Sequence, residues 1–450
     1  MHALVRWRSE VLFLIALVIF AATVLWRSLQ PPAPAFDLPQ RNPRPFEAAN
    51  TGNPATIGQL QDYLRANPDD TTAYATLGLS LLQQVRETSD PILYTQAEQA
   101  FAEALTRDPQ HFEALVGQGM LALSRHQFTE ALAWGEQARS VNPHNAQPYG
   151  ILGDAYTELG QYPEAAAAIQ QMVDVRPDVR SYSRVSYQRE LHGDVAGAIE
   201  AMERAARAGN PNAEETLWAR VQLGHLYFNS GDLARAEAEY IHALETRADY
   251  VPAFAGVARV RAAQGNTTEA IEFYTLIVDR LPLPEYAIAL GDLYTVSGDT
   301  TSAEQQYKLV HTIQQLNKNA GMNTDLEMAL FLADYGDSPT EAVQQARAAY
   351  AQRPSIHAAD VLAWALYQQG HYAEAWQYSQ EALRLGTRDA LFHFHAGMIA
   401  AALDDTAAAH HHYSRPLQSI HTSQCATHRR QPHSWSNLQP QKERPNDHQL

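Results

Sequence analysis

Apolar residues recur at helical spacing from residue 54 onward, and turn-forming residues interrupt them at regular intervals. In residues 146–179, two apolar sets each have the spacing of one helical face: Tyr149, Leu152 and Tyr156, followed by Ala165, Ile169 and Met172. Gly160 and Pro163 break the period between the two sets. The segment therefore predicts two helices joined by a tight turn. Because no segment reads as a strand, the chain is expected to be all-α.

The two-helix pattern repeats along the chain. Ten alanines mark it, most of them 33 or 34 residues apart: Ala97, Ala131, Ala165, Ala198, Ala236, Ala270, Ala303, Ala342, Ala375 and Ala409. Prolines follow the second helix of several units: Pro109, Pro143, Pro177, Pro282 and Pro354. A hairpin this short cannot bury its apolar face alone, so the units have to stack. We expect about ten units in a row, each contacting its nearest neighbours only.

The residues at fixed places in each unit point to a known family. The fullest set is Leu152, Gly153, Tyr156, Gly160, Ala165 and Pro177. This pattern resembles the tetratricopeptide repeat family over roughly residues 54–413, with a lone helix before the first unit. Three units depart from it, through an insertion at 85–91, Val185-Ser186 in place of Leu-Gly, and an irregular unit at 323–354. The resemblance implies a right-handed superhelical α-solenoid that binds peptides or proteins on its concave surface.

The register of that family places a strip of side chains on the concave surface: Arg180, Tyr187, Trp218, His225, Phe228 and Arg259, with Asp292, Phe331, Trp364 and Tyr367 in later units. Aromatic residues and arginine dominate interface hot spots, so the strip is a candidate peptide-binding surface. The alternative is that its aromatic rings pack against neighbouring units. The carboxylate clamp of chaperone-tail-binding members is not expected, because the corresponding positions hold Val116, Met120, Gln147 and Ile151.

Residues 1–30 have a different pattern and predict a membrane anchor. Residues 11–26 carry no charge, and as a helix they would span roughly 24 Å, slightly less than a ~30 Å hydrocarbon core. Arg6 and Arg8 favour a cytoplasmic N-terminus. We therefore predict a single-pass protein whose repeats lie on the periplasmic or extracellular side.

Two alternatives to this anchor stay open. A signal peptide could be cleaved near Ala33-Pro34-Ala35, and Arg27 weakens the predicted orientation. Residues 31–53 are rich in proline and predict an extended linker between the anchor and the repeats.

The C-terminal residues 414–450 break the repeat. Pro416 stands where the last helix should continue, and no helical period follows it. The segment is either a natural disordered extension or the product of a shifted reading frame.

Composition narrows the range of functions. A formal net charge of −17 argues against nucleic acid as the main partner. The single cysteine, Cys425, excludes an intramolecular disulfide and cysteine-based metal sites. No catalytic or nucleotide-binding motif falls in a suitable context, and the histidines at 410–412 fix no ligand geometry. We expect no enzyme activity, cofactor, metal or small-molecule substrate.

These features predict a membrane-anchored, non-enzymatic scaffold that binds a protein or peptide partner on the concave surface of an acidic solenoid. The alternative is an accessory or assembly subunit of a membrane-bound enzyme or envelope maturation system. A catalytic protein with a repeat arm is not expected, because only residues 414–450 are left for a catalytic domain.

Overall fold

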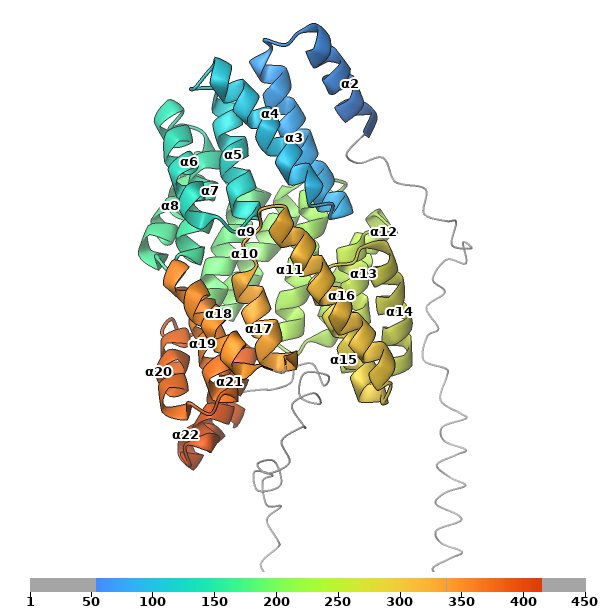
Figure 1. Ribbon diagram of the computed structural model, residues 1–450, viewed down its shortest axis with the longest axis vertical. Coiled ribbons are helices and arrows are strands. Elements are labelled where there is room, and N and C mark those ends of the chain that lie inside the picture. Colours follow the sequence, from blue (N-terminus) through green and yellow to red (C-terminus); the bar gives the residue numbers. More distant parts are fainter. Residues whose placement is uncertain (1–53, 337, 415–450) are drawn as a thin grey trace, which may run out of the picture. The chain divides into compact units, whose positions relative to one another are not determined.

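The computed structural model describes residues 54–336 and 338–414, with side chains from residue 57 onward. All secondary structure in this part of the chain is helical, and successive helices pack in pairs (Figure 1). A lone helix, α2 (Pro54–Ala66), precedes ten pairs: α3 (Thr71–Thr88) and α4 (Ile92–Arg107), α5 (Phe112–Ser124) and α6 (Phe128–Val141), α7 (Ala146–Glu158) and α8 (Tyr162–Val175), α9 (Val179–Leu191) and α10 (Val195–Ala208), α11 (Glu214–Asn229) and α12 (Leu233–Thr246), α13 (Val251–Ala263) and α14 (Thr267–Arg280), α15 (Pro284–Ser297) and α16 (Thr300–Asn319), α17 (Asp325–Tyr335) and α18 (Pro339–Gln352), α19 (Ile356–Gln368) and α20 (Tyr372–Ala382), and α21 (Ala390–Ala402) and α22 (Thr406–Ser414). The predicted all-α stack of about ten hairpins is confirmed for these residues.

The predicted anchor at 11–26, the linker at 31–53 and most of the C-terminal segment lie outside the described residues. Among the helices from α2 to α22, none combines the length and the apolar character needed to cross a bilayer.

A glycine followed by aspartate forms several of the turns inside the hairpins. Gly231 and Gly298 adopt φ values of 85° and 87°, which residues with a Cβ atom rarely adopt. The next residue, Asp232 or Asp299, then accepts a hydrogen bond at 3.0 Å from the backbone N–H three residues later. The dipeptide thus reverses the chain and caps the second helix of the unit. In the turn between α5 and α6, His126 takes the glycine position with a φ of 56°.

The small residues lie where helices approach most closely. The ten repeating alanines are all buried, with exposed fractions of 3% or less. Between repeats, large rings fill the space that glycines leave open. The ring of Phe101 lies against Gly78 and Gly117, and that of Tyr240 against Gly224 and Gly256, so that a Cβ at any of these glycines would collide with the ring. Each repeat is therefore fitted to the next by size.

The expectation that only nearest neighbours touch is wrong. The N–H of Asn323 donates to the carbonyl oxygen of Arg125 at 2.8 Å, and the amide of Gln127 donates to that of Gly321 at 3.2 Å. The buried hydroxyl of Tyr162 accepts from the N–H of Ile356 at 2.8 Å. Repeats separated by almost 200 residues therefore touch. We call these interactions, which join residues 125–128 and 158–162 to 321–327 and 353–356, the closing contact.

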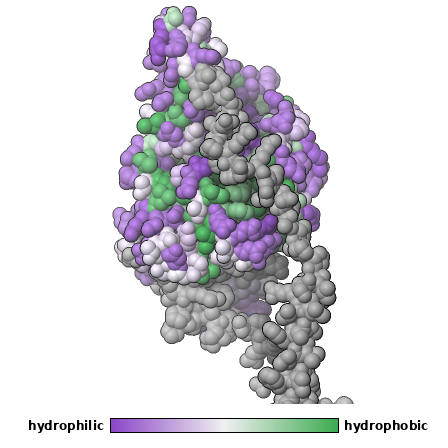
Figure 2. Space-filling view, turned by 90° about the vertical axis from the view of Figure 1, so that its right-hand side faces the viewer, coloured by the Kyte–Doolittle hydropathy of each residue, from purple (hydrophilic) through white to green (hydrophobic). Residues whose placement is uncertain are grey.

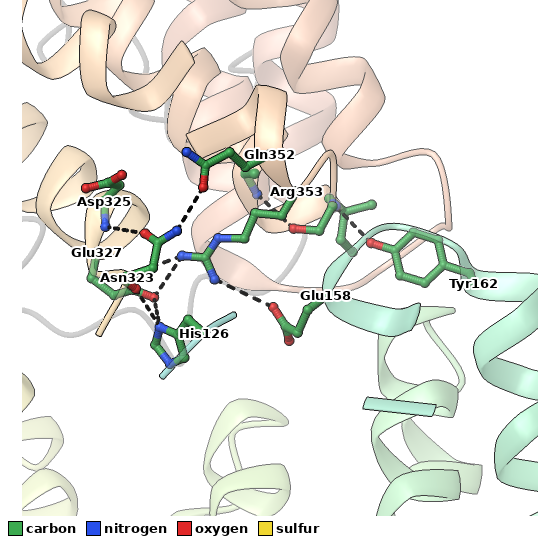
Figure 3. Close-up of polar contacts among 11 residues, drawn as sticks. His126, Glu158, Tyr162, Asn323, Asp325, Glu327, Gln352 and Arg353 are labelled. Atoms are coloured by element: carbon green, nitrogen blue, oxygen red, sulfur yellow. Dashed lines mark hydrogen bonds and ion pairs between the residues drawn. The ribbon is translucent and has the colours of Figure 1, made fainter. Parts of the chain in front are cut away.

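Arg353 is the centre of the closing contact (Figure 3). Its side chain is 6% exposed and lies between Glu327, at 3.1 Å, and Glu158, at 4.0 Å. Its guanidinium also lies 5.4 Å from the ring centre of Phe128. A buried arginine needs several partners at once, and here they come from both ends of the contact. The stack therefore bends back until non-adjacent repeats meet.

Replacing Tyr162 with phenylalanine should loosen the closing contact by about 1–3 kcal/mol, because the buried N–H of Ile356 would lose its acceptor. Hydrogen exchange of residues 355–368 measures the effect directly. Tyr149→Phe is the matched control, since that hydroxyl donates to Pro143 at an exposed place within one region of the stack. Equal exchange in both variants would contradict the assigned role of Tyr162.

Candidate partner-binding groove

A cavity of about 1050 Å³ lies along the first helices of the hairpins from α3 to α13. We call it the inner groove. Its lining combines arginines, carboxylates, aromatic rings and three methionines, Met120, Met172 and Met202. Methionine side chains adapt to differently shaped ligands, and Trp and Arg give strong local contacts. The groove has the size and composition of a ligand site. On the face of the molecule in Figure 2, apolar side chains gather near the middle among hydrophilic ones.

Five of the six predicted strip residues line this one groove: Arg180, Tyr187, Trp218, His225 and Arg259. Trp218 is 42% exposed and Tyr187 is 37% exposed, unusually high values for large aromatic side chains. Both are thus available to a ligand in the groove. Whether the strip binds a partner stays a prediction.

The sixth residue, Phe228, was assigned wrongly. Its side chain is 1% exposed and belongs to a buried cluster with Val257 and Val260 of the next hairpin. The guanidinium of Arg259 covers the ring at 4.1 Å. The alternative interpretation, packing against a neighbouring unit, is therefore the correct one for Phe228. The later residues expected on the concave surface are also buried, with exposed fractions between 1% and 9%: Asp292, Phe331, Trp364 and Tyr367.

Ion pairs between neighbouring repeats fix the walls of the groove. Arg184 on α9 donates two hydrogen bonds, at 2.8 and 2.6 Å, to the two oxygens of Asp154 on α7. Arg180 on α9 pairs with Glu215 on α11 at 2.9 Å. The bidentate pair holds both partners in one geometry. These arginines are therefore already engaged by carboxylates.

Two ionisable groups at the end of the groove are shifted toward their neutral forms. Burial, and then the nearby carboxylate of Asp389, raises the pKa of Glu190 to about 7. Burial, and then the charge of Arg259, lowers the pKa of His225 to about 3. The imidazole Nδ1 of His225 lies 2.8 Å from the hydroxyl of Tyr240. His225 is consequently neutral at physiological pH and serves as a hydrogen-bonding group rather than a cation.

A second cavity, of about 700 Å³, is lined by residues of α15 to α19 and α21. Near it, the hydroxyls of Tyr307 and Tyr335 both donate to Oδ1 of Asp292, each at 2.9 Å. The indole N–H of Trp364 donates to Asp334 at 2.8 Å. No group of three or more histidine, cysteine or acidic side chains within 54–336 and 338–414 is arranged to hold a metal ion.

The sequence interpretation missed Arg184, Asp154 and Glu190 in the groove. A signal for Glu190 existed, because the alignment of Val185-Ser186 with the Leu-Gly pairs makes Glu190 the equivalent of Thr157 and Phe228. Those two residues are 5% and 1% exposed. A carboxylate at a position that neighbouring repeats bury is an exception to the pattern, and such exceptions are often functional.

The sequences of several of these hairpins match models of a known family. Models of the tetratricopeptide repeat match residues 122–185, residues 93–146 and 221–283, and residues 355–388. Residues 93–185, 221–283 and 355–388 therefore carry tetratricopeptide repeats. The hairpins from α15 to α18 lie between the matched segments and are also pairs of helices.

The similarity to individual proteins is lower. The chain is 24% identical over 241 residues to the protein CTR9 homolog of Arabidopsis thaliana, covering 52% of this chain and 22% of that protein. It is 24% identical over 245 residues to the cellulose synthase 1 operon protein C of Komagataeibacter xylinus, covering 52% and 16%. The match thus spans about a fifth of the length of each of these two relatives. A solved structure of the human IFIT1 dimer with PPP-AAAA matches with a TM-score of 0.47 and 16% identity, over 73% of this chain and 77% of that one.

Proposed function

We propose that this protein is a membrane-anchored, non-enzymatic scaffold that binds a peptide or protein partner in the inner groove. The observation that carries the proposal is the half-exposed Trp218 inside a cavity of about 1050 Å³. Large aromatic side chains are normally buried unless they serve an interface. The tetratricopeptide repeats support a protein partner, and the net charge of −17 makes the phosphate backbone of nucleic acid a poor one.

The membrane part of the proposal rests on the sequence. Residues 11–26 are uncharged, and arginines precede them. The repeats are proposed to lie on the exported side. Fractionation of cells that express the full chain, followed by protease treatment of intact spheroplasts, tests both points. Recovery of the protein in the soluble fraction would contradict the proposed anchor. Protection of the repeats from protease would show that the proposed orientation is wrong.

Trp218→Ala should reduce partner capture at least 10-fold in cross-linking experiments on intact cells, because the indole is the largest exposed side chain in the groove. The loss of stability should be small, since 42% of the residue is already exposed. Leu276→Ala is the matched control, because Leu276 on α14 is 56% exposed and does not line the groove. Equal capture by the two variants would remove the groove from consideration.

The similarity to a cellulose synthase operon protein favours a second candidate, an accessory subunit of a membrane-bound enzyme or envelope maturation system. Here the partner would be a subunit of that membrane system. Affinity purification from detergent-solubilised membranes distinguishes the candidates. Recovery of only soluble partners would exclude the accessory role.

A further inference from the structure

The end of the inner groove holds a carboxylate with no cationic partner. Glu190 lies in the last turn of α9 and lines the groove. Its neighbours in the groove include Asn229, at the end of α11, and His225. No ion pair joins Glu190 to any of the described cations, and the groups that influence its pKa are Asp389 and Asn229. A half-buried carboxyl group in this situation is protonated more readily than usual, and a cationic ligand beside it would favour its charged form.

A second carboxylate, Asp389, lies near enough to Glu190 to raise its pKa. Asp389 caps α21, accepting hydrogen bonds from the backbone N–H groups of Leu391 and Phe392 at 2.8 and 3.2 Å. Gly386, just before it in the chain, lies against Gly193 in the turn after α9, where a Cβ would collide with the carbonyl oxygen of Gly386. Asp389 thereby contributes negative potential at Glu190. Asp389 itself does not line the groove, and we call the part of the groove around Glu190 its acidic end.

One groove arginine, Arg259, donates to Asn229 at 3.3 Å and is influenced by the charge of Asp389, so it offsets part of the negative charge at this end. The other arginines near Glu190 are held by other carboxylates. Arg184 is held by Asp154 and Arg180 by Glu215. Arg189, the residue next to Glu190, donates to the carbonyl oxygen of Gly197 and lies 3.8 Å from Glu200. The exposed rings of Tyr187 and Trp218 line the same groove, and aromatic faces attract cations. Carboxylates and aromatic faces together are the chemistry that recognises an ammonium or guanidinium group.

We infer that the inner groove selects an extended segment of the partner by one lysine or arginine side chain, which pairs with Glu190 at the acidic end while an apolar neighbour packs on Trp218. This inference deepens the proposed function and rests on it. The occupant is a protein segment rather than a free polyamine, because the groove continues from Glu190 along apolar residues such as Met172 and Ile151. Only a chain with apolar residues beside the basic one would fill it.

Selection of a random dodecapeptide library displayed on phage, with the full chain as bait, tests the inference. The expected result is enrichment of peptides with lysine or arginine at one fixed place next to an aromatic or aliphatic residue. A synthetic peptide of the enriched sequence should bind Glu190→Gln about 30-fold or more weakly than the wild type, because its charge would be buried without a partner. Binding can be followed by the change in tryptophan fluorescence, and Trp218→Phe identifies the part of the signal that comes from Trp218 among the seven tryptophans.

Glu245→Gln is the matched control, since it removes the same charge from an exposed site on α12 outside the groove and should leave peptide affinity unchanged. Glu190→Gln keeps the shape of the side chain and removes a disfavoured charge, so its helical circular dichroism should match the wild type. Enriched peptides without a basic residue, or equal affinity for Glu190→Gln, would overturn the inference alone. If no peptide is enriched by the wild type, both the inference and peptide binding in the groove are overturned.

Discussion

Phe228→Ala is expected to lower the free energy of unfolding of the region from α11 to α13 by about 3–5 kcal/mol, the usual cost of deleting a buried ring. The side chain is 1% exposed and packs against the next hairpin. Its loss would also remove the surface on which the guanidinium of Arg259 lies at 4.1 Å. Urea unfolding followed by circular dichroism, with hydrogen exchange of residues 214–263, measures the change.

Trp218→Ala, on the same helix, provides the comparison between an exposed and a buried aromatic side chain. Because Trp218 is 42% exposed, its replacement should cost about 1 kcal/mol or less while it reduces partner capture. Phe228→Ala should show the reverse order, a large loss of stability with an indirect effect on binding. If Phe228→Ala were as stable as the wild type, the packing of α11 against α13 would have to be different.

The hairpins could be predicted from the sequence because their causes are local. Alanines that are mostly 33 or 34 residues apart mark the helix crossings, and glycine-aspartate pairs such as Gly231-Asp232 mark several of the turns. Side-chain direction within a helix was harder to predict. Glu190 and Phe228 occupy equivalent positions, yet Glu190 lines the groove whereas the next hairpin covers Phe228. The register identifies the position, but the packing of the neighbouring repeat decides whether it is open.

The closing contact could not be predicted from the sequence, because backbone groups make much of it. It uses the carbonyl oxygens of Arg125 and Gly321 and the N–H groups of Asn323 and Ile356. Almost every residue of any chain carries such backbone groups, so they leave no signal in the sequence. Only the accumulated rotation of several repeats brings these groups together. One-dimensional stacking still accounts for each hairpin, and the closing contact adds an interaction that neighbour-by-neighbour reasoning does not contain.

The closing contact also links the stability of distant repeats to the shape of the groove. Glu158 is the last residue of α7, which contributes Gln147, Ile151 and Asp154 to the groove, and Tyr162 is the first residue of α8. Holding this hairpin against α18 and α19 limits the ways in which α7 can move relative to α9. A preorganised groove loses less entropy on binding. We therefore expect Tyr162→Phe to weaken partner binding as well as to loosen the contact that it makes.

The free energy of unfolding of the second half of the stack is expected to fall by on the order of 2–4 kcal/mol as the carboxyl group of Asp292 ionises, and Asp292→Asn should abolish this pH dependence. Asp292 is 2% exposed, and burial raises its pKa from 3.8 to about 7, although the hydroxyls of Tyr335 and Tyr307 oppose the shift. The folded protein therefore holds a proton that the unfolded chain releases above pH 4. This contribution to stability is complete below about pH 4 and is lost as the pH rises through about 7.

The comparison of urea unfolding at pH 5 and pH 8 isolates this group. The wild type should lose more stability than Asp292→Asn over that interval, because asparagine can still accept from the two tyrosines but cannot ionise. Asp279→Asn removes an exposed carboxylate on α14 and should keep the wild-type slope. An unchanged slope in Asp292→Asn would mean that Asp292 is already ionised in the folded protein at pH 5, so that its two tyrosine hydrogen bonds outweigh the cost of burying its charge.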